Sequence, residues 1–119
     1  METIAKSTSE QIKSSLVYSS SNSITFDGWT SKGNMPYIGI TVLALIGNDY
    51  KDFFLDLIDI DNIDQSSKIL ALNISQSLEN YGLSSENIES CTTDNCNNMV
   101  TTAEYLNIWR IPCVVHMLN

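Results

Sequence analysis

The chain has 119 residues, of which 43% are hydrophobic, so it is long enough for one modest core and too apolar for a disordered segment. It lacks an apolar run of the roughly 20 residues that a membrane span needs, and its first residues lack the pattern of a signal peptide, so we expect an intracellular protein without membrane contact. The net charge is −8 and the six Lys and Arg residues are scattered, so this chain alone should bind DNA or RNA weakly or not at all, because phosphate backbones are bound by clustered bases.

The first predicted element is a helix over residues 2 to 18, in which Ile4, Ile12 and Leu16 have a weak helical spacing. The serine-rich segment Ser19 to Asn22 is typical of a connection. Residues 1–22 are therefore expected to form an N-terminal helix and linker, and residues 23–119 the main domain.

The first strand is predicted in the segment Ser23 to Ser31. Ile24 and Phe26 alternate with polar residues, so Asp27 should project from the opposite face, where a Gly-containing kink ends the strand. The apolar, β-branched run from Tyr37 to Ile46 predicts a central strand.

A tight turn at Gly47 to Asp49 leads into a third strand, from Tyr50 to Asp61, with Phe53, Leu55 and Leu57 expected on one face. The first three strands should form an antiparallel meander.

The second half of the chain predicts two helices, each followed by a strand. The first helix has N-cap candidates at Asp64 to Ser67, an apolar face at Leu70, Ile74, Leu78 and Tyr81, and a stop at Gly82. The strand at residues 88 to 93 leads to Asp94. A helix with Met99, Ala103 and Leu106 inside follows, and then a strand at residues 108 to 115, where Pro112 predicts an edge position or a bulge.

The order α-β-β-β-α-β-α-β predicts an α+β fold with one mixed sheet. It is the order of a ribonuclease H-like domain. In such a sheet the first and fourth strands lie side by side, so we expect Asp27 and Asp94 to lie close together.

Three short blocks carry a family resemblance. Thr25-Phe-Asp-Gly-Trp-Thr-Ser31, Thr92-Thr-Asp-Asn-Cys-Asn-Asn98 and Arg110-Ile-Pro-Cys-Val-Val-His-Met-Leu-Asn119 occur in this order, with Tyr37-Ile-Gly-Ile-Thr-Val42 between the first two. Together they resemble the catalytic core of hAT-superfamily DNA transposases, the superfamily of the ricesleeper-like and BED-zinc-finger proteins. The resemblance covers roughly residues 10 to 119.

This resemblance implies a two-metal site for DNA strand cleavage and transfer, in a nuclear protein. Two Asp and one Glu hold Mg²⁺ or Mn²⁺ in the family, since hard cations prefer oxygen ligands. The resemblance assigns the two aspartate positions to Asp27 and Asp94. The alternative is that each is a solvated strand-end or helix-capping residue.

The family's third ligand, a Glu on a late helix, has no counterpart here. Glu104 and Glu89 are the nearby acids, and neither matches the family position. We therefore expect an incomplete, truncated core, inactive alone, that binds DNA only in its parent protein. It should expose apolar surface, which would promote self-association. The alternatives are a domesticated protein-interaction module without catalysis, and a small metal-dependent nuclease that uses a local Glu.

Three further features have two interpretations each. Cys113 and His116 could bind zinc together with Cys91 and Cys96, or Cys113 could be a core residue while His116 orients polar groups. The odd, uneven set of three cysteines favours a reducing compartment over a disulfide framework.

Trp29 and Trp109 could stack on bases, but packing is the expected role. The acidic run from Asp49 to Asp64 could suggest calcium, but a solvated edge strand is expected.

Overall fold

The computed structural model describes residues 2–30, 36–60, 66–93 and 97–112. Its elements, in chain order, are α1 (Glu2–Leu16), β1 (Ser19–Thr30), β2 (Pro36–Ile46), β3 (Asp49–Asp59), α2 (Ser67–Asn80), the single 3₁₀ turn η1 (Ser85–Asn87), β4 (Ser90–Thr93), α3 (Asn97–Leu106) and β5 (Arg110–Pro112). Among the described residues, no helix combines the length and the apolar character that crossing a membrane requires.

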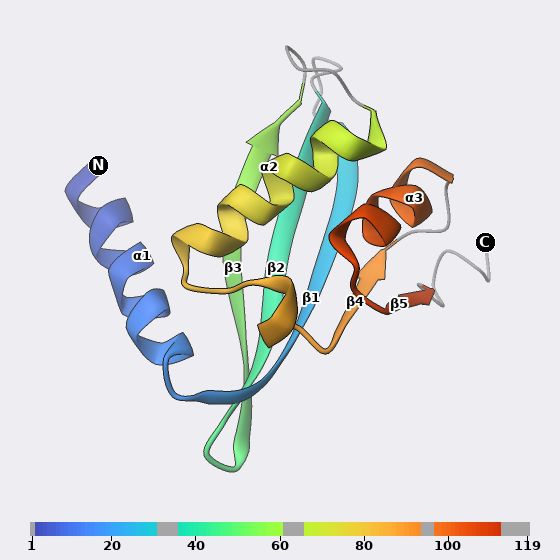
Figure 1. Cartoon of the computed structure of the whole chain (residues 1–119). Coiled ribbons are helices and arrows are strands. Elements are labelled where there is room, and N and C mark those ends of the chain that lie inside the picture. Colours follow the sequence, from blue (N-terminus) through green and yellow to red (C-terminus); the bar gives the residue numbers. More distant parts are fainter. Residues whose placement is uncertain (1, 31–35, 61–65, 94–96, 113–119) are drawn as a thin grey trace.

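The five strands form one mixed sheet in the order β3-β2-β1-β4-β5 (Figure 1). β1, β2 and β3 are antiparallel neighbours, whereas β4 runs parallel to β1 and β5 runs parallel to β4. The predicted α+β class, the meander and the pairing of the first strand with the fourth are confirmed. β5 lies at the sheet edge, as its proline predicted.

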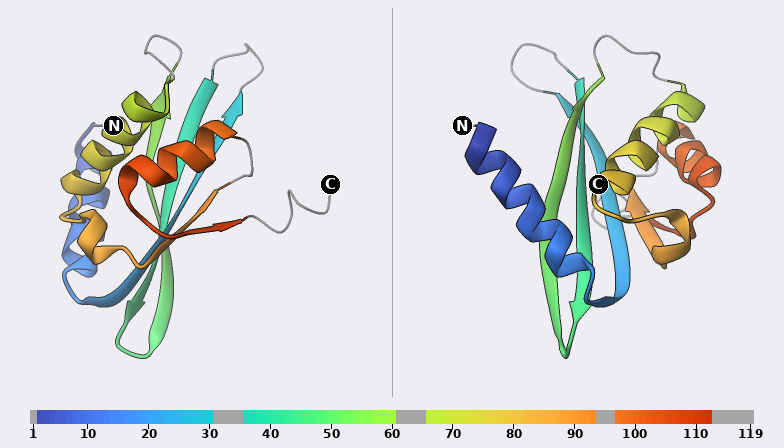
Figure 2. Two further views of the ribbon diagram at one scale, coloured as in Figure 1. Left: turned by 45° about the vertical axis from the view of Figure 1, so that its right-hand side comes forward. Right: turned by 60° about the vertical axis from the view of Figure 1, so that its left-hand side comes forward.

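Two helices, α2 and α3, cover one face of this sheet, and α1 stands beside β3 (Figures 1 and 2). The alternating apolar residues of β1 and β2 point under these helices, which bury their own apolar stripes against the sheet. The core includes the following fully or nearly fully buried residues: Ile24, Phe26, Ile38, Ile40, Val42, Leu70, Ile74, Leu78, Met99, Ala103 and Leu106. The predicted inner face of α3 is confirmed.

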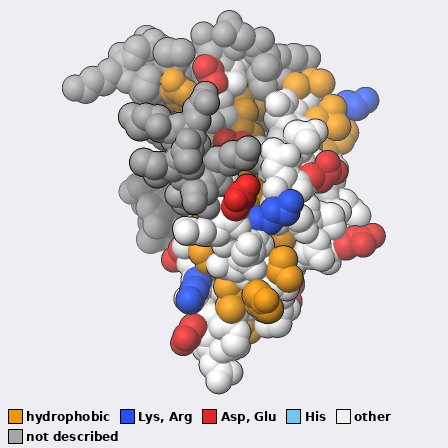
Figure 3. All heavy atoms as spheres, turned by 90° about the vertical axis from the view of Figure 1, so that its left-hand side faces the viewer, with side chains coloured by type: hydrophobic (Ala, Val, Ile, Leu, Met, Phe, Trp, Pro, Cys, Tyr) orange, Lys and Arg blue, Asp and Glu red, His pale blue; other side chains and the backbone are white. Residues whose placement is uncertain are grey.

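The helix α1 is tied to the body of the molecule by Tyr81, which follows α2. The Tyr81 hydroxyl donates to the Leu55 carbonyl oxygen at 2.8 Å and lies 3.4 Å from the Ser9 hydroxyl of α1. Leu16 is buried in the common core. Figure 3 faces this side of the molecule and shows hydrophobic side chains gathered in its lower part, with acidic and basic side chains beside them.

Both covering helices end with a residue in the left-handed region. Gly82 has φ 77, and the N–H groups of Gly82 and Leu83 donate to Glu79 and Leu78 of α2 at 2.9 Å each. Asn107 has φ 58 and closes α3 in the same way. This is the bonding of a Schellman cap, which satisfies the last carbonyl groups of a helix. The predicted helix end at Gly82 is confirmed, whereas the cap at Asn107 was not predicted from the sequence.

The prediction that Ser19 to Asn22 form a linker is wrong, because β1 begins at Ser19. Ser19 and Ser21 pair with Ile46 and Leu45 at the end of β2, and Asn22 pairs with Ala44. Asn22 is buried, and its side-chain amide donates to the Asn87 carbonyl oxygen at 3.3 Å. Serine-rich composition predicted a loop, but cross-strand pairing overrides this weak local preference.

The expected kink after Asp27 is also wrong. β1 continues through Gly28, which pairs with Ile38, as far as Thr30. A Cβ atom at Gly28 would lie 3.2 Å from the Met99 methyl group. The glycine therefore allows α3 to approach β1 closely, and Asp27 lies within a strand.

The predicted face of β3 is partly wrong. Leu55 is buried, but Leu57 is exposed, because the register with β2 shifts between Ile40 and Thr41. Such a bulge adds a residue to one strand and moves the following side chains to the other face. The last strand begins at Arg110, two residues later than predicted, and is described as far as Pro112; its expected residues 113–115 lie outside the described residues.

Candidate functional site

Asp27 lies on the face of the sheet opposite α2 and α3, which we call the open face. It pairs with Gly39 of β2, and its side chain is exposed, whereas Phe26 beside it is fully buried. The projection predicted from the alternation is therefore confirmed. A carboxylate here keeps its water and can offer oxygen atoms to a cation, so a solvated aspartate and a metal ligand both suit this position.

The neighbouring strand β4 runs parallel to β1 in a fixed register. Ser23 pairs with Ser90 and Thr25 with Thr92, an offset of 67 residues, which is also the offset between Asp27 and Asp94 in the sequence. β4 ends at Thr93. Asp94 itself, and with it the second half of the predicted pair, lies outside the described residues.

Polar contacts hold β1 to both of its neighbours on the open face. The hydroxyl oxygens of Ser23 and Ser90 are 3.1 Å apart, and the hydroxyls of Thr25 and Thr41 are hydrogen-bonded. Below them, the N–H of Glu89 donates to the Asn22 carbonyl oxygen at 2.8 Å. Asp27 therefore stands on a strand whose position is fixed from both sides.

Within the described residues, Asp27 does not belong to a cluster of three carboxylates. These residues hold no group of three His, Cys, Asp or Glu side chains that could bind a metal ion. Glu104 lies on α3, over the covered face, and Glu89 precedes β4 instead of lying on it. Asp59 is on the open face but two strands away, roughly 10 Å at the usual strand spacing. The described acids therefore do not complete a site of three ligands.

Cys91 is a buried core residue on the covered face. It pairs with Ile24, and burial raises the pKa of its thiol to about 11, with Arg110 acting in the opposite direction. A protonated, enclosed thiol is a poor metal ligand, since zinc binds the thiolate. This favours the core role for Cys91. The other residues of the zinc hypothesis, Cys96, Cys113 and His116, lie outside the described residues.

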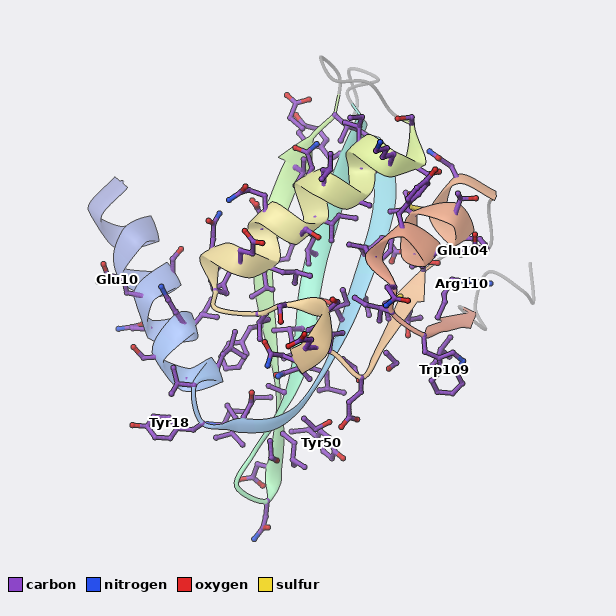
Figure 4. All side chains as sticks on the ribbon, viewed as in Figure 1. Glu10, Tyr18, Tyr50, Glu104, Trp109 and Arg110 are labelled. Carbon is purple, nitrogen blue, oxygen red and sulfur yellow. The ribbon has the colours of Figure 1, made fainter. Side chains whose placement is uncertain are left out.

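Trp109 is exposed, so the expectation that it packs in the core is wrong. It lies just before the edge strand β5, where 74% of its surface is accessible, and its indole projects away from α3 (Figure 4). Its backbone remains part of the sheet, because its carbonyl oxygen accepts the Cys91 N–H at 2.8 Å. The side chain of Trp29 lies outside the described part of the structure.

The acidic run lies on an edge strand, as expected. β3 is at the sheet edge, and Asp49, Asp52 and Asp59 are exposed. Asp56 is half-buried and accepts a hydrogen bond of 2.7 Å from the hydroxyl of Ser77 on α2. Asp61 and Asp64 lie outside the described residues.

The sequence interpretation missed which apolar residues would be exposed on the open face. They are Leu43 of β2 and Tyr50, Phe54 and Leu57 of β3. Leu43 could have been found because it lies between the buried Val42 and Ala44. Tyr50 and Phe54 could have been found because they alternate with the predicted inner face of the strand. Leu57 depends on the bulge, which the pattern does not show, because the register shift turns its side chain to the open face. A scan against protein-family models and a search of curated proteins both find no match to this chain.

Proposed function

We propose that this chain is a ribonuclease H-like unit of the hAT transposase type, in which Asp27 and Asp94 form two of the three acidic positions of a site for DNA strand cleavage and transfer. The observation that carries the proposal is the parallel pairing of β1 with β4 at the offset that separates the two aspartates. The three sequence blocks support the assignment to this superfamily. A fold alone would not support it, since one fold hosts many functions.

In this proposal Asp27 and Asp94 hold Mg²⁺ or Mn²⁺, ions that carboxylate oxygens suit. The metal ions supply activation of water or of a 3′-hydroxyl group and stabilise the leaving oxygen. Asp27 offers a solvated carboxylate on a strand fixed by neighbours on both sides. The resemblance places the third carboxylate on a late helix that has no counterpart in residues 1–119, and it implies that the parent protein binds DNA in the nucleus. The chain by itself is catalytically silent, because loss of one acidic ligand weakens the hold on the metal.

The test is calorimetric titration of Mn²⁺ into the 119-residue chain. We expect weak binding, with a dissociation constant of roughly 10⁻⁴ to 10⁻³ M, the range of weak carboxylate sites. Asp27→Asn and Asp94→Asn should each weaken it at least tenfold. Asp52→Asn, at an exposed acid on the same face, is the matched control and should leave it unchanged. Equal binding by all four proteins would contradict the proposal.

A second function, a protein-interaction module without catalysis, is favoured by a different observation. The open face exposes large apolar side chains on β2 and β3. Contiguous apolar surface of this kind is typical of an interaction site. This role and the metal site do not exclude each other, because Asp27 lies on β1, beside the apolar surface.

A further inference from the structure

An apolar surface occupies the open face over two neighbouring strands. We call it the β2–β3 patch and define it by four exposed residues: Leu43, Tyr50, Phe54 and Leu57. By register, Tyr50 pairs with Leu45, Phe54 with Thr41, and Leu57 with Gly39, so all four side chains lie on the side opposite α2 and α3. Figure 4 shows Tyr50 at the lower end of the sheet. The exposed fraction reaches 57% for Phe54 and 67% for Tyr50.

The charged side chains that the structure describes around this patch are acidic. Asp52 and Asp59 of β3 and Asp27 of β1 all lie on the open face and are exposed. The described bases lie elsewhere. Lys13 is on α1, Lys68 on α2, and Lys51 and Arg110 pair with the covered-face residues Ala44 and Cys91. Within the described residues, the open face therefore combines apolar and negatively charged groups.

This charge pattern favours a basic partner protein over a second copy of the chain as the molecule that covers the patch. A second copy would bring its own acids against Asp52 and Asp59, and each copy carries a net charge of −8. Like charges brought together at an interface cost several kcal/mol. A partner with Lys or Arg beside its apolar residues would instead be attracted.

We propose that the β2–β3 patch binds an amphipathic helix of another protein, with an apolar stripe over Phe54 and Leu57 and flanking Lys or Arg residues facing Asp52 and Asp59. A helix suits the surface because a sheet face is normally covered by a second layer of secondary structure. From Tyr50 to Leu57 the patch extends roughly 23 Å along β3, at about 3.3 Å per residue. A helix of about 15 residues spans this length. The inference does not depend on the metal site proposed above.

The experiment uses a synthetic amphipathic peptide of about 15 residues, with a leucine stripe flanked by lysines, titrated into the 119-residue chain at low salt. Calorimetry gives the affinity, and amide NMR shifts give the place of binding. We expect saturable binding, with shifts confined to β2 and β3. The same peptide with glutamate in place of lysine should bind at least tenfold more weakly, and so should the lysine peptide at 0.5 M salt.

Two matched variants locate the surface. Phe54 and Leu72 are exposed to the same degree, 57% and 58%, but Leu72 is on α2. Phe54→Ser should weaken binding of the lysine peptide at least tenfold, and Leu72→Ser should not. Because both side chains are largely solvated, both variants should fold, which their amide spectra verify. The pair Asp52→Asn with Asp59→Asn should weaken binding at low salt only.

Three results would overturn the inference. One is equal binding of the lysine and glutamate peptides. Another is binding that Leu72→Ser removes and Phe54→Ser does not. The third is a dimer in sedimentation experiments that Phe54→Ser dissociates, because a second copy would then cover the patch. None of these variants alters Asp27 or Asp94, so the manganese titration remains a separate test of the proposed function.

Discussion

At the scale of single residues, the alternation of apolar and polar side chains was a reliable guide within β1. It predicted that Ile24 and Phe26 would be buried and that Asp27 would face the other way, because successive side chains of a strand point to opposite faces. It could not predict the exposure of Trp109, which depends on the place of β5 at the edge of the sheet and not on the local pattern.

Cys91 provides a test at this scale. Burial raises its thiol pKa to about 11 from an ordinary value of 9.0, so between these pH values the folded chain holds a proton that the unfolded chain has lost. The stabilisation is complete below pH 9 and declines as pH rises towards 11, at no more than about 1.4 kcal/mol per pH unit. Urea unfolding of the chain and of Cys91→Ala at pH 8 to 10.5 should show the steeper decline for the unmodified chain. Parallel pH profiles would contradict the buried, protonated thiol.

At the scale of elements, the sequence predicted each α-helix and strand but not all of their ends, and it did not predict the 3₁₀ turn η1. Composition placed a loop at Ser19 to Asn22, whereas pairing with β2 makes it strand. The bulge in β3 was invisible because Phe53, Phe54, Leu55 and Leu57 form an apolar run with no single period. Gly82 was predictable, since glycine tolerates the positive φ of a helix cap, but Asn107 carries a weaker signal.

The two helix caps give a matched prediction. Gly82→Ala should lower the free energy of unfolding by about 1 kcal/mol, since an L residue with a Cβ is strained at φ 77. The added Cβ meets no atom within 4 Å, so the loss arises from the backbone alone. Asn107→Gly at φ 58 should instead be neutral or stabilising by a few tenths of a kcal/mol. Urea denaturation of both variants measures this, and an unchanged or raised stability of Gly82→Ala would show that the cap is not strained by a side chain.

At the scale of the whole molecule, the order of elements predicted one mixed sheet, and its likeness to the order of a ribonuclease H-like domain predicted the first strand beside the fourth; this arrangement is observed. The register could not be predicted, because it depends on side-chain pairs such as Ser23 with Ser90, far apart in the sequence. The β2–β3 patch on the open face is likewise a product of the assembled sheet, since its residues come from two strands and the bulge turns Leu57 to that face.

The central proposal, that Asp27 and Asp94 stand side by side, is tested most directly by cross-linking. Asp27→Cys with Asp94→Cys, in a chain with Cys91→Ala, Cys96→Ser and Cys113→Ser, should form a disulfide under mild oxidation. Neighbouring strands are about 5 Å apart, within the range that a disulfide spans. The control, Thr25→Cys with Asp94→Cys, is two residues out of register and roughly 8 Å apart by strand geometry, so it should form at least tenfold more slowly. Rapid closure of the first pair alone is the predicted result. Equal rates, or a faster control, would contradict the shared site.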